Sequence, residues 1–145
     1  MISTSALAAA PPQTFALPTQ HRVKLTKPLD CRAIAGTSIG EKNGHLEAEA
    51  SPGKDHFTVV RVGHFLRVTA HHDVTQTGEE TDLYTITGDT QDFISAVQGV
   101  KLLPVIHGLV INKRLGSAVW SESDSALILA SDYPFTASVF LNCTN

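Results

Sequence analysis

The residues from 57 to 74 alternate between apolar and polar side chains, which is the period of two expected along a β-strand. One side of the pattern is apolar and consists of Val60, Val62, Leu66, Val68 and Ala70. The other side is polar and consists of Arg61, Arg67, Thr69, His71 and Asp73. The pattern predicts either one long bent strand or two strands separated by a break at Gly63.

Shorter alternating or apolar segments, separated by turn residues, occur along the rest of the chain, for example at residues 21–26, 45–50 and 81–87. Together they predict eight or nine short strands. A run of short strands with one short helix indicates a mainly β fold, an antiparallel β-sandwich or barrel. At 145 residues, with no linker to a second domain, residues 21–145 are predicted to form a single β-rich domain.

The predicted helix covers about residues 90–98. Asp89 or Thr90 can cap its N-terminus, because both side chains offer an oxygen to free backbone N–H groups. Three apolar side chains then share one helical face, namely Phe93, Ile94 and Val97. A helix this short requires packing against the sheet.

Two further segments carry specific expectations. Residues 36–44 are predicted to be a loop that ends in a turn at Asn43-Gly44. Residues 105–111 are apolar on both sides of the strand period, which predicts a central strand covered on both faces.

The first twenty residues are predicted to be a flexible arm. Residues 1–12 carry no positive charge and only a short apolar run, so they do not fit a secretory signal peptide. No run approaches the roughly 18 apolar residues of a transmembrane helix, and no membrane partner is expected. These features predict synthesis in the cytoplasm, with a virion as one destination.

The chain has few charges for a protein of its size. Charged residues make up 17% of the sequence, against roughly 25% in an ordinary soluble domain. This composition predicts that part of the surface contacts other protein. The leading hypothesis is therefore a self-assembling structural protein, such as a viral coat (capsid) or virion component or another homo-oligomeric shell subunit, whose arm and edge strands are completed by neighbouring copies.

The alternative hypothesis is a small β-barrel enzyme or a ligand-binding protein with an apolar cavity. The apolar residues that could line such a cavity are Phe57, Phe65, Tyr84, Val105, Ile106, Leu109 and Trp120. Its polar groups could come from Glu49, His64 or His107. Core packing is the favoured interpretation of these apolar residues.

A basic sheet face is a weaker hypothesis. Arg22, Lys24, Arg61 and Arg67 could line one side of a sheet and contact phosphates. The net charge of −3 and the lack of interleaved aromatic residues argue against nucleic acid as a partner.

No pattern predicts a catalytic residue, a metal site or a cofactor. His64 and His72 share a strand face but would lie roughly 26 Å apart on an extended strand, which is too far for one ion. Residues 36–40, GTSIG, match the letters G-x-S-x-G, but they open no predicted helix as a nucleophile elbow would. Whether the protein is an enzyme is left open.

The two cysteines, Cys31 and Cys143, lie near opposite ends of the chain. A bridge between them would close a long loop. Because two cysteines are too few for a disulfide framework, two buried free thiols are the favoured interpretation.

Overall fold

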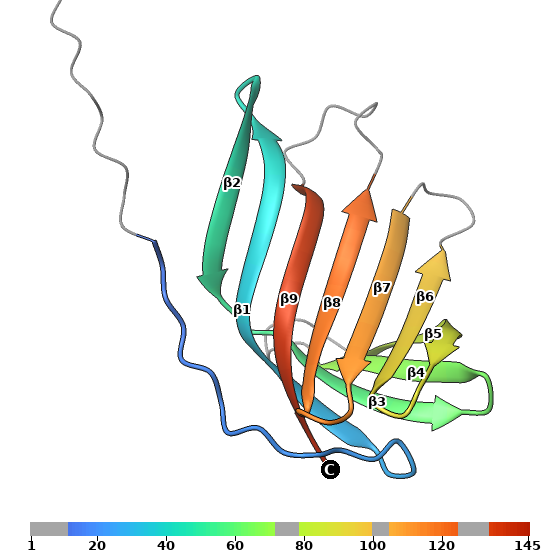
Figure 1. The fold of residues 1–145 in the computed structure, drawn as a ribbon. Helices are drawn as coiled ribbons and strands as arrows, with labels where there is room; N and C mark the ends of the chain where they lie inside the picture. Colours follow the sequence, from blue (N-terminus) through green and yellow to red (C-terminus); the bar gives the residue numbers. More distant parts are fainter. Residues whose placement is uncertain (1–11, 72–78, 100–104, 125–133) are drawn as a thin grey trace, which may run out of the picture.

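The computed structural model describes residues 12–71, 79–99, 105–124 and 134–145. Within these residues the chain forms strands and no helix, as Figure 1 shows. The strands are β1 (Leu29–Lys42), β2 (His45–Pro52), β3 (His56–Val62), β4 (Phe65–His71), β5 (Glu79–Asp89), β6 (Phe93–Gly99), β7 (Val105–Asn112), β8 (Ser117–Asp124) and β9 (Pro134–Thr144). The predicted mainly β, antiparallel fold is confirmed, and of the two architectures it is the barrel.

The barrel has eight strands and is closed by β1. From β3 to β9 each strand pairs antiparallel with the next one along the chain. β1 pairs with β9 along nearly its whole length, and its first residues, Leu29 to Arg32, also pair with β3. Beyond a bulge between Ala33 and Ala35, β2 takes the place of β3 beside β1. Among the described strands only β2 lies outside the barrel, and all of its residues are exposed.

The core occupies the barrel interior toward one end. Its fully buried members include Leu66, Ile94 and Leu141, and each points inward from a different strand. The segment before β1 closes this end: Val23 is buried, and its backbone N–H donates to the carbonyl of Lys113 at 2.9 Å. Figure 1 shows the segment passing beneath the barrel. We call the end of the barrel that this segment covers the closed end.

A disulfide links the first and last barrel strands. Cys31 and Cys143 are direct cross-strand partners, both fully buried, and their sulfur atoms are bonded. The expectation of two free thiols is therefore wrong. The number of cysteines was not informative here, because barrel closure places β1 beside β9 and so brings the two cysteines together.

The helix predicted at residues 90–98 is wrong, since these residues form the turn before β6 and β6 itself. Thr90 does make the expected capping bond, accepting from the Phe93 N–H at 3.1 Å, but the backbone then closes a tight β5–β6 turn. Ile94 points inward, while Phe93 and Val97 point outward and are 49% and 41% exposed. Hydrogen bonds to β5 and β7 on either side override the local helical pattern.

Other local predictions have mixed outcomes. The turn at Asn43-Gly44 is confirmed, and both residues have the positive φ values, 53° and 78°, that a two-residue hairpin requires. The remainder of the predicted loop, residues 36–42, is strand instead, because it pairs with both β2 and β9. The break at Gly63 is confirmed as the turn between β3 and β4.

The alternation over residues 57–74 does not continue on one face. The turn at Gly63 changes which residues of the alternating pattern point inward. On β3 Phe57 and Val59 are therefore buried, whereas Val62 is 47% exposed. The prediction that residues 105–111 are covered on both faces is also wrong for this structure. Leu109 and Ile111 are buried, but Ile106 and Val110 point outward and are 59% and 46% exposed.

Candidate functional site

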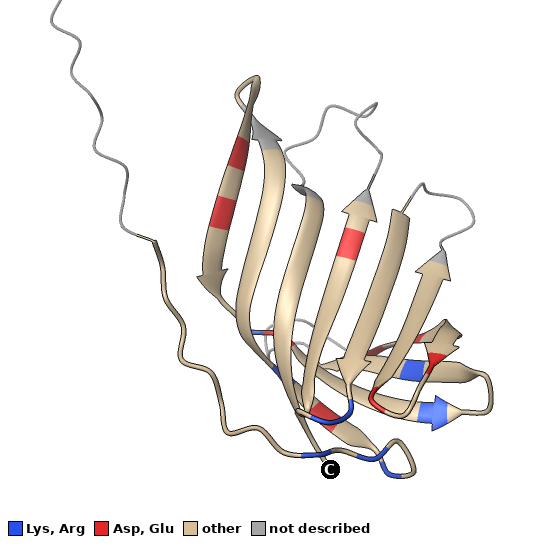
Figure 2. Cartoon of the chain, in the orientation of Figure 1, with Lys and Arg blue, Asp and Glu red and all other residues tan. Residues whose placement is uncertain are grey.

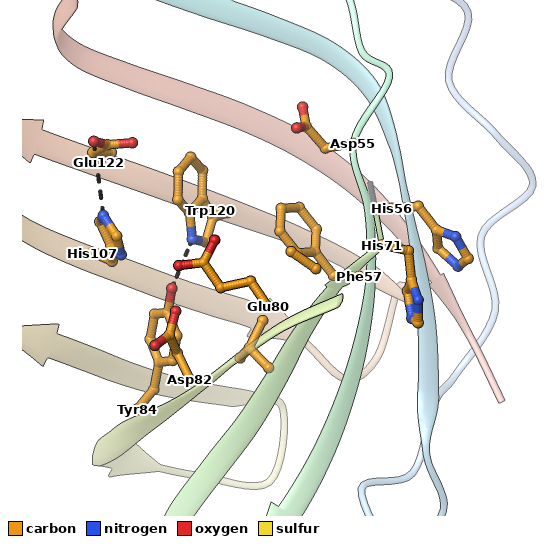
Figure 3. Close-up of a pocket in the computed structure, with 12 residues that line it drawn as sticks. Asp55, His56, Phe57, His71, Glu80, Asp82, Tyr84, His107, Trp120 and Glu122 are labelled. Carbon is orange, nitrogen blue, oxygen red and sulfur yellow. Dashed lines mark hydrogen bonds and ion pairs between the residues drawn. The ribbon is translucent and has the colours of Figure 1, made fainter. Parts of the chain in front are cut away.

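A pocket of about 240 Å³ lies inside the barrel, beyond the core from the closed end. Figure 3 shows the side chains that surround it. They come from β3, β4 and β5 on one wall, from β7 and β8 on the other, and from the residue that precedes β3. The lining residues are Asp55, His56, Phe57, Val68, Ala70, His71, Glu80, Asp82, Tyr84, His107, Trp120 and Glu122.

Aromatic rings form the floor of the pocket. Trp120 on β8 donates its indole N–H to the hydroxyl of Tyr84 on β5 at 3.0 Å, which joins the two walls. Phe57 stacks on Trp120 with ring centroids 5.9 Å apart. His107 adds a fourth ring, with its centroid 5.4 Å from that of Trp120. Because each ring contacts another, the floor presents a fixed aromatic surface.

The Tyr84 phenol stays protonated at neutral pH. Burial raises the pKa of Tyr84 above its usual value, and the charges of Asp82, Glu122 and Glu80 raise this pKa further. The hydrogen bond from Trp120 acts in the opposite direction but does not outweigh them. Tyr84 therefore accepts a hydrogen bond from Trp120 and keeps its own proton to donate.

Carboxylates surround the aromatic floor. Asp82 lies two residues from Tyr84 on β5, and Glu122 lies two residues from Trp120 on β8, so each faces inward like its aromatic neighbour. His107 Nε2 lies 3.8 Å from a Glu122 carboxylate oxygen, while its Nδ1 lies 3.0 Å from Oε1 of Gln98. These contacts orient the imidazole between the floor and the carboxylate.

Two further histidines lie at the edge of the pocket, away from the floor (Figure 3). The rings of His56 and His71 are 4.5 Å apart between centroids. His56 pairs with Asp30, and His71 contacts Thr58 at 2.6 Å and a carboxylate of β5 at 3.0 Å. Burial works to raise the pKa of Asp30, but the contacts with His56 and with a neighbouring arginine lower it overall. Each imidazole thus already has a protein partner.

Of the residues suggested for a cavity, four line this pocket: Phe57, Tyr84, His107 and Trp120. The others lie elsewhere. Leu109 belongs to the core, and Phe65 and Ile106 are exposed on the outer surface. Val105 is half-buried at the start of β7, and Glu49 lies on β2; neither lines the pocket. His64 is exposed in the turn between β3 and β4.

The four residues of the suggested basic face are not brought onto one surface. Arg22 and Lys24 lie in the segment before β1, and Arg22 is 3.8 Å from Asp92. Arg67 points outward from β4, whereas Arg61 lies opposite the buried Leu66 and so belongs to the inward face of β3. Arg61 also donates to Asp89 at 2.6 Å.

The sequence reasoning missed the acidic lining. Glu80, Asp82 and Tyr84 are spaced two residues apart on one strand, as are Trp120 and Glu122 on another. This spacing places a carboxylate on the same face as an aromatic ring twice in the chain. This spacing could have been recognised in the sequence, but only the closure of the barrel shows that the inward faces of β5 and β8 lie opposite each other.

Comparison with protein-family models, with curated proteins and with solved structures finds no match to this chain. Within the described residues, no group of three or more His, Cys, Asp or Glu side chains is arranged to hold a metal ion. Nor do these residues contain a helix of the length and apolar character needed to cross a membrane.

Proposed function

We propose that this protein binds a small ligand in the pocket between β3–β5 and β7–β8. The observation that carries the proposal is the aromatic floor: Tyr84 and Phe57 each contact Trp120 beneath a space of about 240 Å³ ringed by polar groups. Binding sites commonly combine an apolar base with a few placed polar groups. This proposal corresponds to the ligand-binding alternative that the sequence suggested. The expected cavity was apolar, whereas the lining of this pocket also contains several acidic residues.

Intrinsic fluorescence tests this proposal directly. Trp120 is the only tryptophan in the chain and lies in the pocket floor, so its emission reports on this site alone. We expect a chemically diverse set of small molecules to contain compounds that change the emission saturably and release heat in calorimetry.

A filled pocket provides the matched comparison. Ala70 lines the pocket, and Ala70→Phe should abolish binding without altering charge. Ala48→Phe, on the exposed strand β2, adds the same side chain away from the pocket and should leave binding unchanged. Compounds that bind Ala70→Phe as tightly as the wild type would refute the proposal.

A second candidate function, self-assembly, is supported by the outer surface. In Figure 2 the Lys, Arg, Asp and Glu residues lie on β2–β5, on β8 and at the closed end, whereas the strands β6, β7 and β9 carry none. Four outward valine and isoleucine side chains form an apolar patch on β6–β8: Val97, Ile106, Val110 and Val119, which are 40–59% exposed. Val110 and Val119 are direct cross-strand neighbours.

Such a surface suits contact with a second copy of the chain, because an apolar sheet face is stabilised when it is removed from water. β2 adds an edge with pairing on one side only among the described strands. Light scattering of the purified protein tests this candidate. A species larger than one chain that Val110→Lys dissociates, and that Thr81→Lys on β5 leaves intact, supports it; a monomer at all concentrations refutes it.

A further inference from the structure

The pocket is negatively charged. Four of its lining residues are carboxylic acids, Asp55, Glu80, Asp82 and Glu122, and none of the lining residues described is Lys or Arg. The remaining polar groups are imidazoles, the Tyr84 hydroxyl and the Trp120 indole. We infer that the ligand is a small organic cation, a protonated amine attached to an aromatic or apolar group. This inference rests on the proposed function, since it names the class of ligand that the same pocket takes.

The positions of two carboxylates indicate where the positively charged group of the ligand binds, which is beside the aromatic floor. The Trp120–Tyr84 hydrogen bond fixes the separation of the two walls. Asp82 and Glu122 each lie one pleat farther from the closed end than the bonded pair, about 7 Å along their strands. They therefore flank the space directly above the rings. Their charges act together on the Tyr84 hydroxyl, whose pKa they raise in concert with burial.

The aromatic floor is the second reason for a cation. The faces of tryptophan, tyrosine and phenylalanine rings attract positive charge, most strongly where water is excluded. Tyr84 is 2% exposed and Phe57 is 7% exposed, so both rings are shielded from bulk water. An ammonium group seated between the floor and the carboxylates would gain from both, and its apolar part would contact Phe57, Trp120 and Val68.

Other ligand classes fit this pocket less well. An anion would be repelled by the carboxylates, with no arginine or lysine in the described lining to offset them. A neutral apolar ligand would displace water from Asp82 and Glu122 without replacing their hydrogen bonds, which is unfavourable. The volume of about 240 Å³ lies below the range for drug-sized ligands, so a compact amine is expected.

The experiment compares three probes with the same ring and similar chain length. These are phenethylamine, 2-phenylethanol and 3-phenylpropionate, which at pH 7 are positive, neutral and negative. Affinity is measured from Trp120 fluorescence and confirmed by calorimetry on the full chain. We expect phenethylamine to bind at least tenfold more tightly than the alcohol, and the carboxylate to bind most weakly. Raising the salt concentration should weaken amine binding selectively.

Two isosteric variants locate the charge. Asp82→Asn and Glu122→Gln remove one negative charge each, and either should weaken phenethylamine binding about fivefold or more while leaving 2-phenylethanol unaffected. Asp92→Asn removes one negative charge near the closed end, where Asp92 contacts Arg22, and should change neither affinity. Circular dichroism of the three variants checks that each is folded.

The outcomes separate this inference from the proposed function. The cation assignment is overturned if the alcohol or the carboxylate binds as tightly as the amine. It is also overturned if the compounds of the diverse set that bind are neutral or negative. In both cases the proposed binding function stands. If neither the probes nor the diverse set changes Trp120 emission, both fail. Tight amine binding that Asp82→Asn and Glu122→Gln leave unchanged also overturns the inference.

Discussion

The bridge between Cys31 and Cys143 is expected to dominate the stability of this barrel. It joins residues 112 positions apart. In the chain-entropy model, a loop of this length stabilises the folded state by about 5 kcal/mol at 25 °C, since the bridge restricts the unfolded chain. A small domain has a total stability of roughly 5–15 kcal/mol. For 145 residues the entropy of unfolding is about 0.3 kcal/mol/K, so reduction should lower Tm by about 16 °C.

The folded structure should survive reduction, because the contact between β1 and β9 does not depend on the bridge. The two strands pair from Asp30 to Gly40 through backbone hydrogen bonds, and Cys31 and Cys143 remain buried in the core. The effect is therefore expected in the unfolded state. The denaturant dependence of the unfolding free energy should also steepen, because the open unfolded chain exposes more surface.

The assay is urea unfolding followed by circular dichroism, with the protein unfolded and refolded in the presence or absence of a phosphine reductant. The double variant Cys31→Ala/Cys143→Ala serves as the control, since the reductant should not change its midpoint. Thiol titration in denaturant should find no free thiol before reduction and two after it. A reduced protein within about 1 kcal/mol of the oxidised protein would show that loop closure is not the source of stability.

Three further predictions concern the closed end and the core. Asp89 accepts hydrogen bonds from Lys113 and Arg61, and these lower its pKa below the usual value of an aspartate. Asp89→Asn should therefore destabilise by up to about 1 kcal/mol at pH 7. This difference from wild type should be lost as the pH falls through the lowered pKa of the Asp89 carboxyl, and a constant difference in acid urea titrations would contradict this. Gly116 has φ +64°, and a Cβ there would lie 2.6 Å from a backbone oxygen of the segment before β1. Gly116→Ala should therefore lower Tm far more than Gly63→Ala, which has a similar φ but open space around it; equal losses would show that only backbone strain matters. Leu66→Ala, at a fully buried position, should cost about 2–5 kcal/mol in urea unfolding, and a loss below 1 kcal/mol would mean that the core is not packed as described.

Local chemistry was enough to predict much of the architecture. Period-two alternation at residues 45–50 and 81–87 lies within β2 and β5, and the turns at Asn43-Gly44 and Gly63 depend on φ values that favour those residues. These signals involve neighbours in sequence, so they can be read without knowledge of the fold. The same locality explains the error at residues 90–98, where Thr90 makes a bond typical of a helix start in a turn between strands.

The sequence by itself therefore determined that this chain is built from short antiparallel strands, with turns at identifiable places. Only the tertiary structure decided that the sheet closes on itself, and closure depends on the pairing of β1 with β9 across more than a hundred residues. The same closure joins Cys31 to Cys143 and sets the Tyr84 wall against the Trp120 wall. A pocket between two walls is a property of their separation in space, which no pattern along either strand contains. For that reason the aromatic residues of the pocket could be named from the sequence, whereas the acidic lining around them could not.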